Sequence, residues 1–153
     1  AVIQACQHLG NIDGLVCLAD HDASVALADM TMSDFNRVLE ANMTYAMRAA
    51  RQIMRLMIQK HHGSIVFITP TDPVHPRPGQ IAYAAAFGGL ESFARSAAMD
   101  GFRHRVRVNC LMVNDRKNNC QSMIRAIQYL LDEESSYVTG SSITVGEARI
   151  TGW

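Results

Sequence analysis

The chain has 153 residues, of which 48% are hydrophobic, and its 14 basic side chains balance 14 acidic ones. A single domain of this length buries about 70% of the surface that its unfolded chain exposes, so a sizeable core is expected. The zero formal charge gives no electrostatic reason to expect nucleic acid or a membrane as a partner, and no stretch approaches the ~20 apolar residues of a membrane-spanning helix.

The cysteines are far apart and follow no pattern typical of disulfides or zinc sites (Cys6, Cys17, Cys110 and Cys120). The N-terminus lacks the basic, apolar and small-residue order of a signal peptide. The chain is therefore predicted to be cytoplasmic, with free thiols and no metal site. Asp20, His21 and Asp22 form a small polar group that is compatible with a metal or proton site, but a solvated loop is the preferred interpretation.

Four short apolar runs predict strands. Continuous apolar sequence suits a strand that is covered on both faces, as in a parallel sheet. The predicted strands are 15–19, 65–68, 106–113 and 143–145. Residues 1–9 are predicted to be the end of a helix that stops at Gly10.

Three helices are predicted between these strands. Residues 33–61 carry apolar side chains at helical spacing, with Ser33 as the expected N-cap and Gly63 as the expected left-handed stop. An alanine-rich helix is predicted over 80–100 and an amphipathic helix over 122–131.

The segments between these elements are predicted to be loops. Residues 20–32 are polar and predict a loop or a short helical turn, and 69–79 hold all four prolines and should be extended. The order β-α-β-α-β-α-β, with right-handed crossovers, predicts an α/β fold. This is a three-layer, Rossmann-like partial domain with a mostly parallel sheet of about four strands and helices on both faces. Residues 1–153 are expected to form a single domain, which is compatible with being one domain of a longer protein.

Several segments resemble the short-chain dehydrogenase/reductase family. The strand after Gly63 and the helix that carries Tyr83 resemble its catalytic segment. Residues 11–16, 105–109 and 137–145 are similar to its fourth strand, its sixth strand and its last turn and strand. The resemblance implies the C-terminal part of the family's Rossmann-type domain, in a degenerate, N-terminally truncated member that lacks the cofactor-binding half.

The residues that border the cofactor in this family are replaced here. No glycine-rich phosphate loop occurs anywhere in the sequence, so no such turn offers backbone amides to a pyrophosphate. The family's Asn-Asn-Ala-Gly segment reads Cys-Leu-Ala-Asp, ending at Asp20, and its Pro-Gly pair is Val113-Asn114. No cofactor-binding residues and no bound cofactor are therefore expected.

Two catalytic positions of the family remain, and two are lost. Tyr83 matches the catalytic tyrosine, and Asn42 matches the structural asparagine. The serine thirteen residues before the tyrosine is Pro70, and the lysine one helical turn after it is Phe87. A phenol titrates near 10 without a neighbouring cation, so Tyr83 is expected to be a packed or hydrogen-bonded remnant. Thr69 and Thr71 carry hydroxyls next to Pro70, but because side chains alternate along a strand, both are expected to point to the side opposite Pro70.

The preferred hypothesis is a catalytically inactive domain with a structural, oligomerisation or protein-interaction role. The alternative is an NAD(P)-dependent oxidoreductase with an atypical site or one completed by a partner chain. A third hypothesis is a sensor that binds a small molecule in the vacated cleft near Tyr83 and Asn42.

Two surfaces are expected to meet partners. The family resemblance implies a homo-oligomer that packs through helices 33–61 and 80–100, the second of which is smooth with alanine and glycine. The strand 15–19 would form an exposed apolar edge of the sheet, which natural proteins avoid. A partner or a missing domain is expected to cover it.

Overall fold

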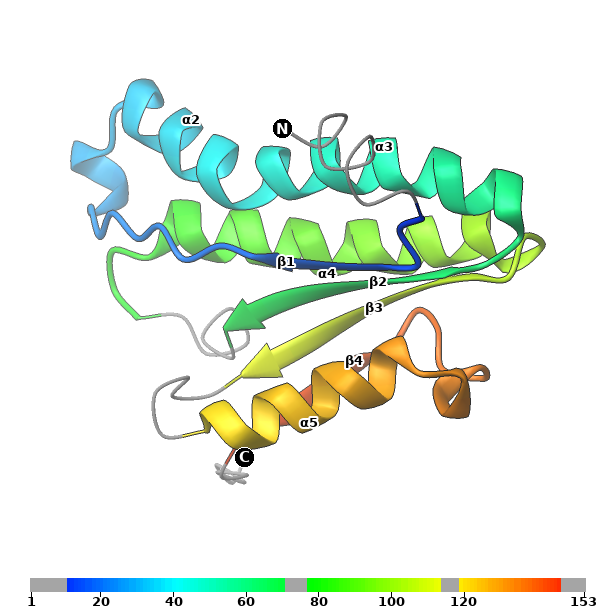
Figure 1. Ribbon diagram of the computed structural model, residues 1–153. Coiled ribbons are helices and arrows are strands. Elements are labelled where there is room, and N and C mark those ends of the chain that lie inside the picture. Colours follow the sequence, from blue (N-terminus) through cyan, green and yellow to red (C-terminus); the bar gives the residue numbers. More distant parts are fainter. Residues whose placement is uncertain (1–10, 71–76, 114–118, 147–153) are drawn as a thin grey trace.

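The computed structural model describes residues 11–70, 77–113 and 119–146. Four parallel strands form one sheet in the order β1 (Gly14–Leu18), β2 (Gly63–Pro70), β3 (Val106–Val113) and β4 (Ser142–Val145). Helices α3 and α4 lie on one face of the sheet, and α5 lies on the other (Figure 1). The prediction of a three-layer α/β fold with a parallel sheet of four strands is confirmed.

The two central strands are buried on both faces, which explains why their sequences are almost continuously apolar. Every residue of β2 is buried, and β3 is buried except for the half-buried Met112. Alternate side chains pack into two separate cores, one on the side of α3 and α4 and the other on the side of α5. β2 extends beyond the apolar run 65–68, because Thr69 and Pro70 still pair with Met112 and Val113 of β3.

The long helix begins earlier than the predicted cap. Helix α2 (Met32–Leu39) starts after Thr31, whose backbone is extended and whose hydroxyl oxygen accepts a hydrogen bond from the Asp34 amide at 3.1 Å. The prediction of Ser33 as N-cap is therefore wrong, because Ser33 already lies in the first turn. A π-helical turn (Glu40–Thr44) then leads into α3 (Tyr45–Lys60).

The end of this helix also differs from the prediction. His61 takes the left-handed conformation, with φ of 53°, whereas Gly63 is the first residue of β2. The glycine is needed for space: a Cβ atom at position 63 would lie 2.3 Å from the Met57 sulfur. The prediction of Gly63 as the helix stop is wrong, because close packing and not helix termination selects glycine there.

The remaining helices agree with the predicted ones to within two residues at each end. Helix α4 spans Ile81–Phe102 and α5 spans Cys120–Leu131, and 3₁₀ turns occur at Leu27–Asp29 and Glu133–Ser135. α4 packs so closely on the sheet that a Cβ atom at Gly101 would lie 2.5 Å from the Val106 carbonyl oxygen. None of the described helices is both long and apolar enough to cross a membrane.

Strand β1 is less covered than the central strands. Its Cys17 side chain is buried in the core beneath α3, whereas Val16 and Leu18 are 39% and 55% exposed. Among the described residues, β1 pairs only with β2, and what covers its outer edge stays a prediction. The helix predicted over 1–9, Thr71 and most of the loop over 114–119 lie outside the described residues.

Candidate functional site

Tyr83 lies in the first turn of α4, at the carboxyl end of the parallel sheet. Its side chain is buried, and its ring meets Phe87 edge to face, with ring centroids 4.7 Å apart. The helical spacing of four residues places these two rings on the same side of α4. Phe87 is fully buried, so the position of the family's lysine is part of the core.

The phenol of Tyr83 makes a short hydrogen bond. Its hydroxyl donates to the Oδ1 atom of Asp20 at 2.6 Å. Asp20 is exposed and follows β1 by two residues, at the place where the family has the last residue of its cofactor-bordering segment. The sequence predicted a hydrogen-bonded tyrosine but did not identify Asp20 as its partner, because the two residues are 63 positions apart.

Asn42 lies in the π-helical turn and is fully buried. Its side-chain oxygen accepts from the His21 amide at 2.8 Å, and its side-chain nitrogen donates to the carbonyl oxygens of His21 and Val38 at 2.7 and 2.9 Å. Asn42 therefore holds the loop after β1 against the long helix. The sequence already allowed a local hydrogen-bonding role at this position.

The same loop is also tied to the start of α4. The Gln80 side chain donates to Asp22 at 3.2 Å, and the Val25 amide donates to the Gly79 carbonyl at 3.0 Å. Among the described residues, no group of three or more His, Cys, Asp or Glu side chains is placed to hold a metal ion. Asp20 and Asp22 instead accept hydrogen bonds from Tyr83 and Gln80, which hold the loop after β1 in place.

Thr69 is a buried polar group on the Tyr83 side of the sheet. Thr69 pairs with Met112 of β3, so the two side chains lie on the same face of the sheet. The neighbours of Met112, Leu111 and Val113, belong to the core beneath α5. Because side chains alternate along a strand, Thr69 faces the other core, which contains Tyr83. Thr69 therefore points to the side opposite Pro70, as predicted, and this is the side on which Tyr83 lies. Its hydroxyl is fully buried and has no hydrogen-bond partner within the described part of the chain.

A shallow cavity of about 580 Å³ opens beside this loop, at the carboxyl end of β1. Its described lining includes the carboxylates of Asp20 and Glu40, together with the side chains of Leu18, His21 and Tyr45. Neither Tyr83 nor Asn42 is part of the described lining of this cavity.

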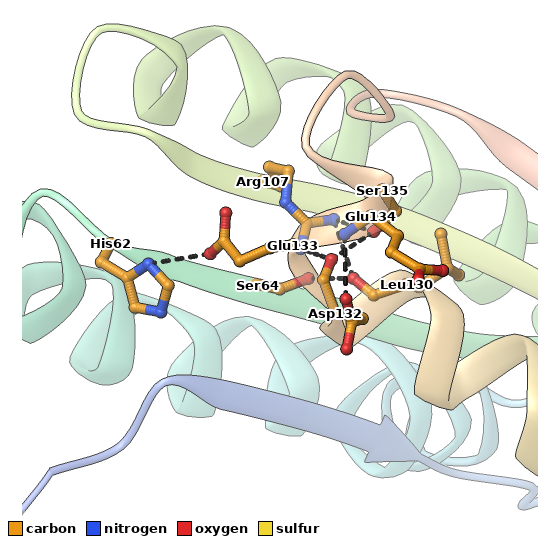
Figure 2. Close-up of polar contacts among 8 residues, drawn as sticks. All are labelled: His62, Ser64, Arg107, Leu130, Asp132, Glu133, Glu134 and Ser135. Carbon is orange, nitrogen blue, oxygen red and sulfur yellow. Dashed lines mark hydrogen bonds and ion pairs between the residues drawn. The ribbon is translucent and has the colours of Figure 1, made fainter.

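A second polar cluster, missed by the sequence interpretation, lies at the amino end of the sheet (Figure 2). The guanidinium of Arg107 in β3 donates to the Leu130 carbonyl at 2.8 Å, to the Ser135 hydroxyl at 2.7 Å and to the Asp132 carbonyl at 3.0 Å. Ser64 of β2 donates to the same Leu130 carbonyl at 2.7 Å. Together these donors satisfy the carbonyl groups that the end of α5 leaves without helical partners.

Burial lowers the pKa of Arg107, and the nearby charges of Glu133 and Asp132 oppose this effect. The Glu133 carboxylate also lies 3.2 Å from the His62 Nδ1 atom, in an exposed contact that is an ion pair when the imidazole is protonated. The only sign of this cluster in the sequence was the charged Arg107 inside an apolar strand, and this sign does not reveal the partners of Arg107. The position of this cluster, at the end of the sheet away from Tyr83, indicates a structural role.

Comparison with known proteins identifies the family. A family model described as short chain dehydrogenase matches residues 1–127, so the chain belongs to the short-chain dehydrogenase family. It is 29% identical to nodulation protein G of Rhizobium sp. (strain N33), with 90% of this chain and 66% of that protein covered. It is 26% identical to the 3-oxoacyl-(acyl-carrier-protein) reductase of Escherichia coli (strain K12), with 89% of this chain and 66% of the reductase covered.

Solved structures have the same fold. A short chain dehydrogenase from Mycobacterium smegmatis is 27% identical, with a TM-score of 0.88 over 97% of this chain and 64% of that one. The acetoin dehydrogenase YohF from Salmonella typhimurium has a TM-score of 0.91 at 24% identity, over 100% of this chain and 70% of that one, and shares the fold. The chain thus spans about two thirds of the length of the relatives that it matches.

Proposed function

We propose that this chain is a family member that does not transfer hydride and acts through contacts with other proteins. The observation that carries the proposal is the environment of Tyr83, whose hydroxyl donates to a carboxylate and whose ring packs on Phe87. The family resemblance assigns Tyr83 the role of acid and base, which requires a cation one helical turn later. The buried Phe87 ring cannot supply that charge.

Asp20 acts against the ionised form of this tyrosine. A carboxylate accepts a hydrogen bond from a protonated phenol, but it repels a phenolate, since like charges disfavour ionisation. The short contact of 2.6 Å therefore stabilises the form of Tyr83 that is not a base. Pro70, where the family has serine, carries no hydroxyl to polarise a substrate carbonyl.

The described residues also do not fit a nicotinamide dinucleotide. The cavity at the carboxyl end of β1 is lined by Asp20 and Glu40, whose charges repel the pyrophosphate of such a cofactor. This repulsion supports the absence of cofactor binding as part of the proposal.

The competing function is that of an NAD(P)-dependent oxidoreductase whose site is atypical or completed by a partner chain. It is favoured by the survival of Tyr83 and Asn42 at their family positions and by relatives whose names include reductases and dehydrogenases. The two functions make opposite predictions about cofactor binding by the chain.

Calorimetric titration of the full chain with NADH and with NADPH separates them. We expect no saturable heat for the wild type, with the E. coli relative as positive control. The double variant Pro70→Ser/Phe87→Lys restores the missing side chains and is expected to remain inactive as a reductase, because Asp20 and Glu40 still line the cavity and repel the pyrophosphate. Saturable binding of either cofactor to the wild-type chain would overturn the proposal.

Self-association through helices 33–61 and 80–100 is the protein contact that we propose first. A groove of about 250 Å³ lies between α3 and α4, with Met54, Ile58 and Phe93 in its half-buried lining. Arg51 and Arg55 line it from α3, whereas Asp100 lines it from α4. A second copy in antiparallel orientation would bring the basic side of one groove to the acidic side of the other.

Sedimentation equilibrium tests this contact. We expect a dimer that Ala97→Trp disrupts, because the indole fills the groove, and that Gln121→Trp on the exposed face of α5 leaves intact. Circular dichroism checks that both variants fold. A monomeric wild type at tens of micromolar would contradict self-association, without bearing on the cofactor titration.

A further inference from the structure

Two histidines from separate turns meet at the amino end of the sheet. His61 follows α3 and leads toward β2, and His104 follows α4 and leads toward β3. The turns lie side by side because β2 and β3 are parallel neighbours that pair from their first residues. The two imidazole rings approach with centroids 5.3 Å apart and an interplanar angle of 31°. His61 is exposed and His104 is half-buried, so the pair can be reached from solvent through His61.

One ring nitrogen of His104 lacks the partner that a buried polar atom needs. Its Nδ1 atom is buried, and no described group forms a hydrogen bond with it. Leaving a buried polar atom without a partner is unfavourable, and a bound ion or ligand is one of the usual reasons for such an atom. Neutral imidazole nitrogen is the most common metal ligand in proteins.

The backbone fixes both histidines at the ends of helices. His61 is the C-cap of α3 and takes the left-handed conformation, with φ of 53°, and its amide donates to the Ile58 carbonyl at 3.2 Å. The His104 amide donates to the Gly101 carbonyl of α4 at 2.9 Å. The carbonyl ends of two helices therefore lie near the pair, and their dipoles favour a bound cation.

The neighbouring polar side chains are directed elsewhere. The Nδ1 atom of His62 lies 3.2 Å from the carboxylate of Glu133, in the turn after α5 (Figure 2). Lys60 donates to the Asn11 side chain at 2.8 Å. In the described part of the chain, no third His, Cys, Asp or Glu completes a group of three around the histidine pair. An ion bound to the pair would therefore take its remaining ligands from water.

We propose that His61 and His104 form a binding site for a divalent transition-metal ion such as Zn²⁺. The Nδ1 atom of His104 and one ring nitrogen of His61 are its protein ligands. Zn²⁺ lies about 2.0–2.1 Å from an imidazole nitrogen, so two rings that share the ion must be close neighbours, as these are. The site is at the opposite end of the sheet from Tyr83, so this inference goes beyond the proposed function and does not depend on it.

The surrounding charges set the expected affinity. Arg103 and Arg105 flank His104 and are exposed, and their positive charges oppose that of the ion. With two protein ligands and this repulsion, we expect a dissociation constant on the order of 10 μM for Zn²⁺.

Titration of the full chain with ZnCl₂ tests the site. Nuclear magnetic resonance follows the imidazole C–H signals, and calorimetry measures the affinity. We expect the signals of His61 and His104 to shift together and to saturate at one ion per chain, whereas the signal of His62 stays in place. Single histidine variants assign the signals.

His61→Asn and His104→Asn each remove one of the two ligands. Asparagine tolerates the left-handed backbone at position 61, so this variant should keep the fold, which circular dichroism checks. We expect each variant to bind Zn²⁺ at least about tenfold more weakly than the wild type. His62→Asn, at the next position along the chain, is the matched control and should bind like the wild type.

Two outcomes would overturn the proposal. The first is that the His61 and His104 signals of the wild type do not move up to about 1 mM Zn²⁺. The second is equal Zn²⁺ affinity in the wild type, His61→Asn and His104→Asn, which would place any bound ion on another group, such as the exposed Cys120 thiol. The first outcome is measured on the wild-type chain, so it does not depend on whether a variant folds.

Discussion

The two ends of the sheet are fastened by different polar networks. At the amino end, the buried Arg107 links the end of α5 to β3, and most of its partners are backbone carbonyl groups (Figure 2). At the carboxyl end, Asn42 and Tyr83 fasten the loop after β1, and Asp20, which accepts from Tyr83, is exposed. The comparison teaches that residues at a family's catalytic positions can make contacts of the same kind as residues in a purely structural cluster.

The two networks also differ in whether all of their buried polar groups have hydrogen-bond partners. The Arg107 guanidinium and the Asn42 amide make several hydrogen bonds each, whereas the Thr69 hydroxyl at the carboxyl end has no partner among the residues that the structure describes. Five substitutions, taken from the largest expected effect to the smallest, test whether both networks are structural.

Arg107→Leu should have the largest effect. It leaves the Leu130 and Asp132 carbonyls and the Ser135 hydroxyl short of a charged donor in a buried place, and we expect a loss of about 3 kcal/mol in unfolding free energy. Urea denaturation measures this loss, with the exposed Arg125→Leu on α5 as control. Equal midpoints for the two variants would show that the cluster does not stabilise the fold.

Asn42→Leu removes three hydrogen bonds while keeping a similar side-chain volume. We expect a loss of about 2 kcal/mol, because the His21 amide and the His21 and Val38 carbonyls each lose a partner. The matched control is Asn36→Leu on the exposed side of α2. Hydrogen exchange of the His21 amide should speed up only in Asn42→Leu; unchanged exchange would contradict the role of Asn42 in holding the loop.

Tyr83→Phe keeps the ring contact with Phe87 and removes the hydrogen bond to Asp20. A loss of about 1 kcal/mol is expected, and it should be smaller in an Asp20→Ala background, because that bond is then already absent. Tyr45→Phe, at an exposed tyrosine, is the control. Any measurable reductase activity that Tyr83→Phe abolishes would instead make Tyr83 catalytic.

Thr69→Val should raise stability, by about 0.5 kcal/mol, since it replaces a buried hydroxyl that has no partner with a methyl group of similar size. Thr144→Val, at an exposed position of β4, controls for the change in strand propensity. A clear loss of stability in Thr69→Val would mean that the hydroxyl binds a ligand or a water in solution. The carboxyl end would then contain a functional site.

Glu133→Gln should have the smallest effect. The ion pair with His62 is exposed on both sides, and such pairs contribute about 0–1 kcal/mol. We expect less than about 0.5 kcal/mol at moderate salt. A loss comparable to that of Arg107→Leu would show that the amino-end network depends on this ion pair more than on the buried guanidinium.

Much of the fold could be predicted from local sequence. Apolar runs predicted all four strands, although only β2 and β3 are covered on both faces, and connection rules then predicted their order. Helix termini were predicted less well. Thr31 and Ser33 are both good caps, and only the backbone conformation decides which of them accepts from an amide.

The sequence by itself determined the fold class, the family and the substitutions Pro70 and Phe87 at two catalytic positions, since these depend on patterns of neighbouring residues. Only the tertiary structure decided which groups meet. Asp20 reaches Tyr83 across 63 positions, Arg107 reaches Ser135 across 28, and Thr69 turns its hydroxyl toward the core that contains Tyr83. The physical reason is that side-chain partners are set by strand register and helix packing, which join distant parts of the chain and leave no local trace in the sequence.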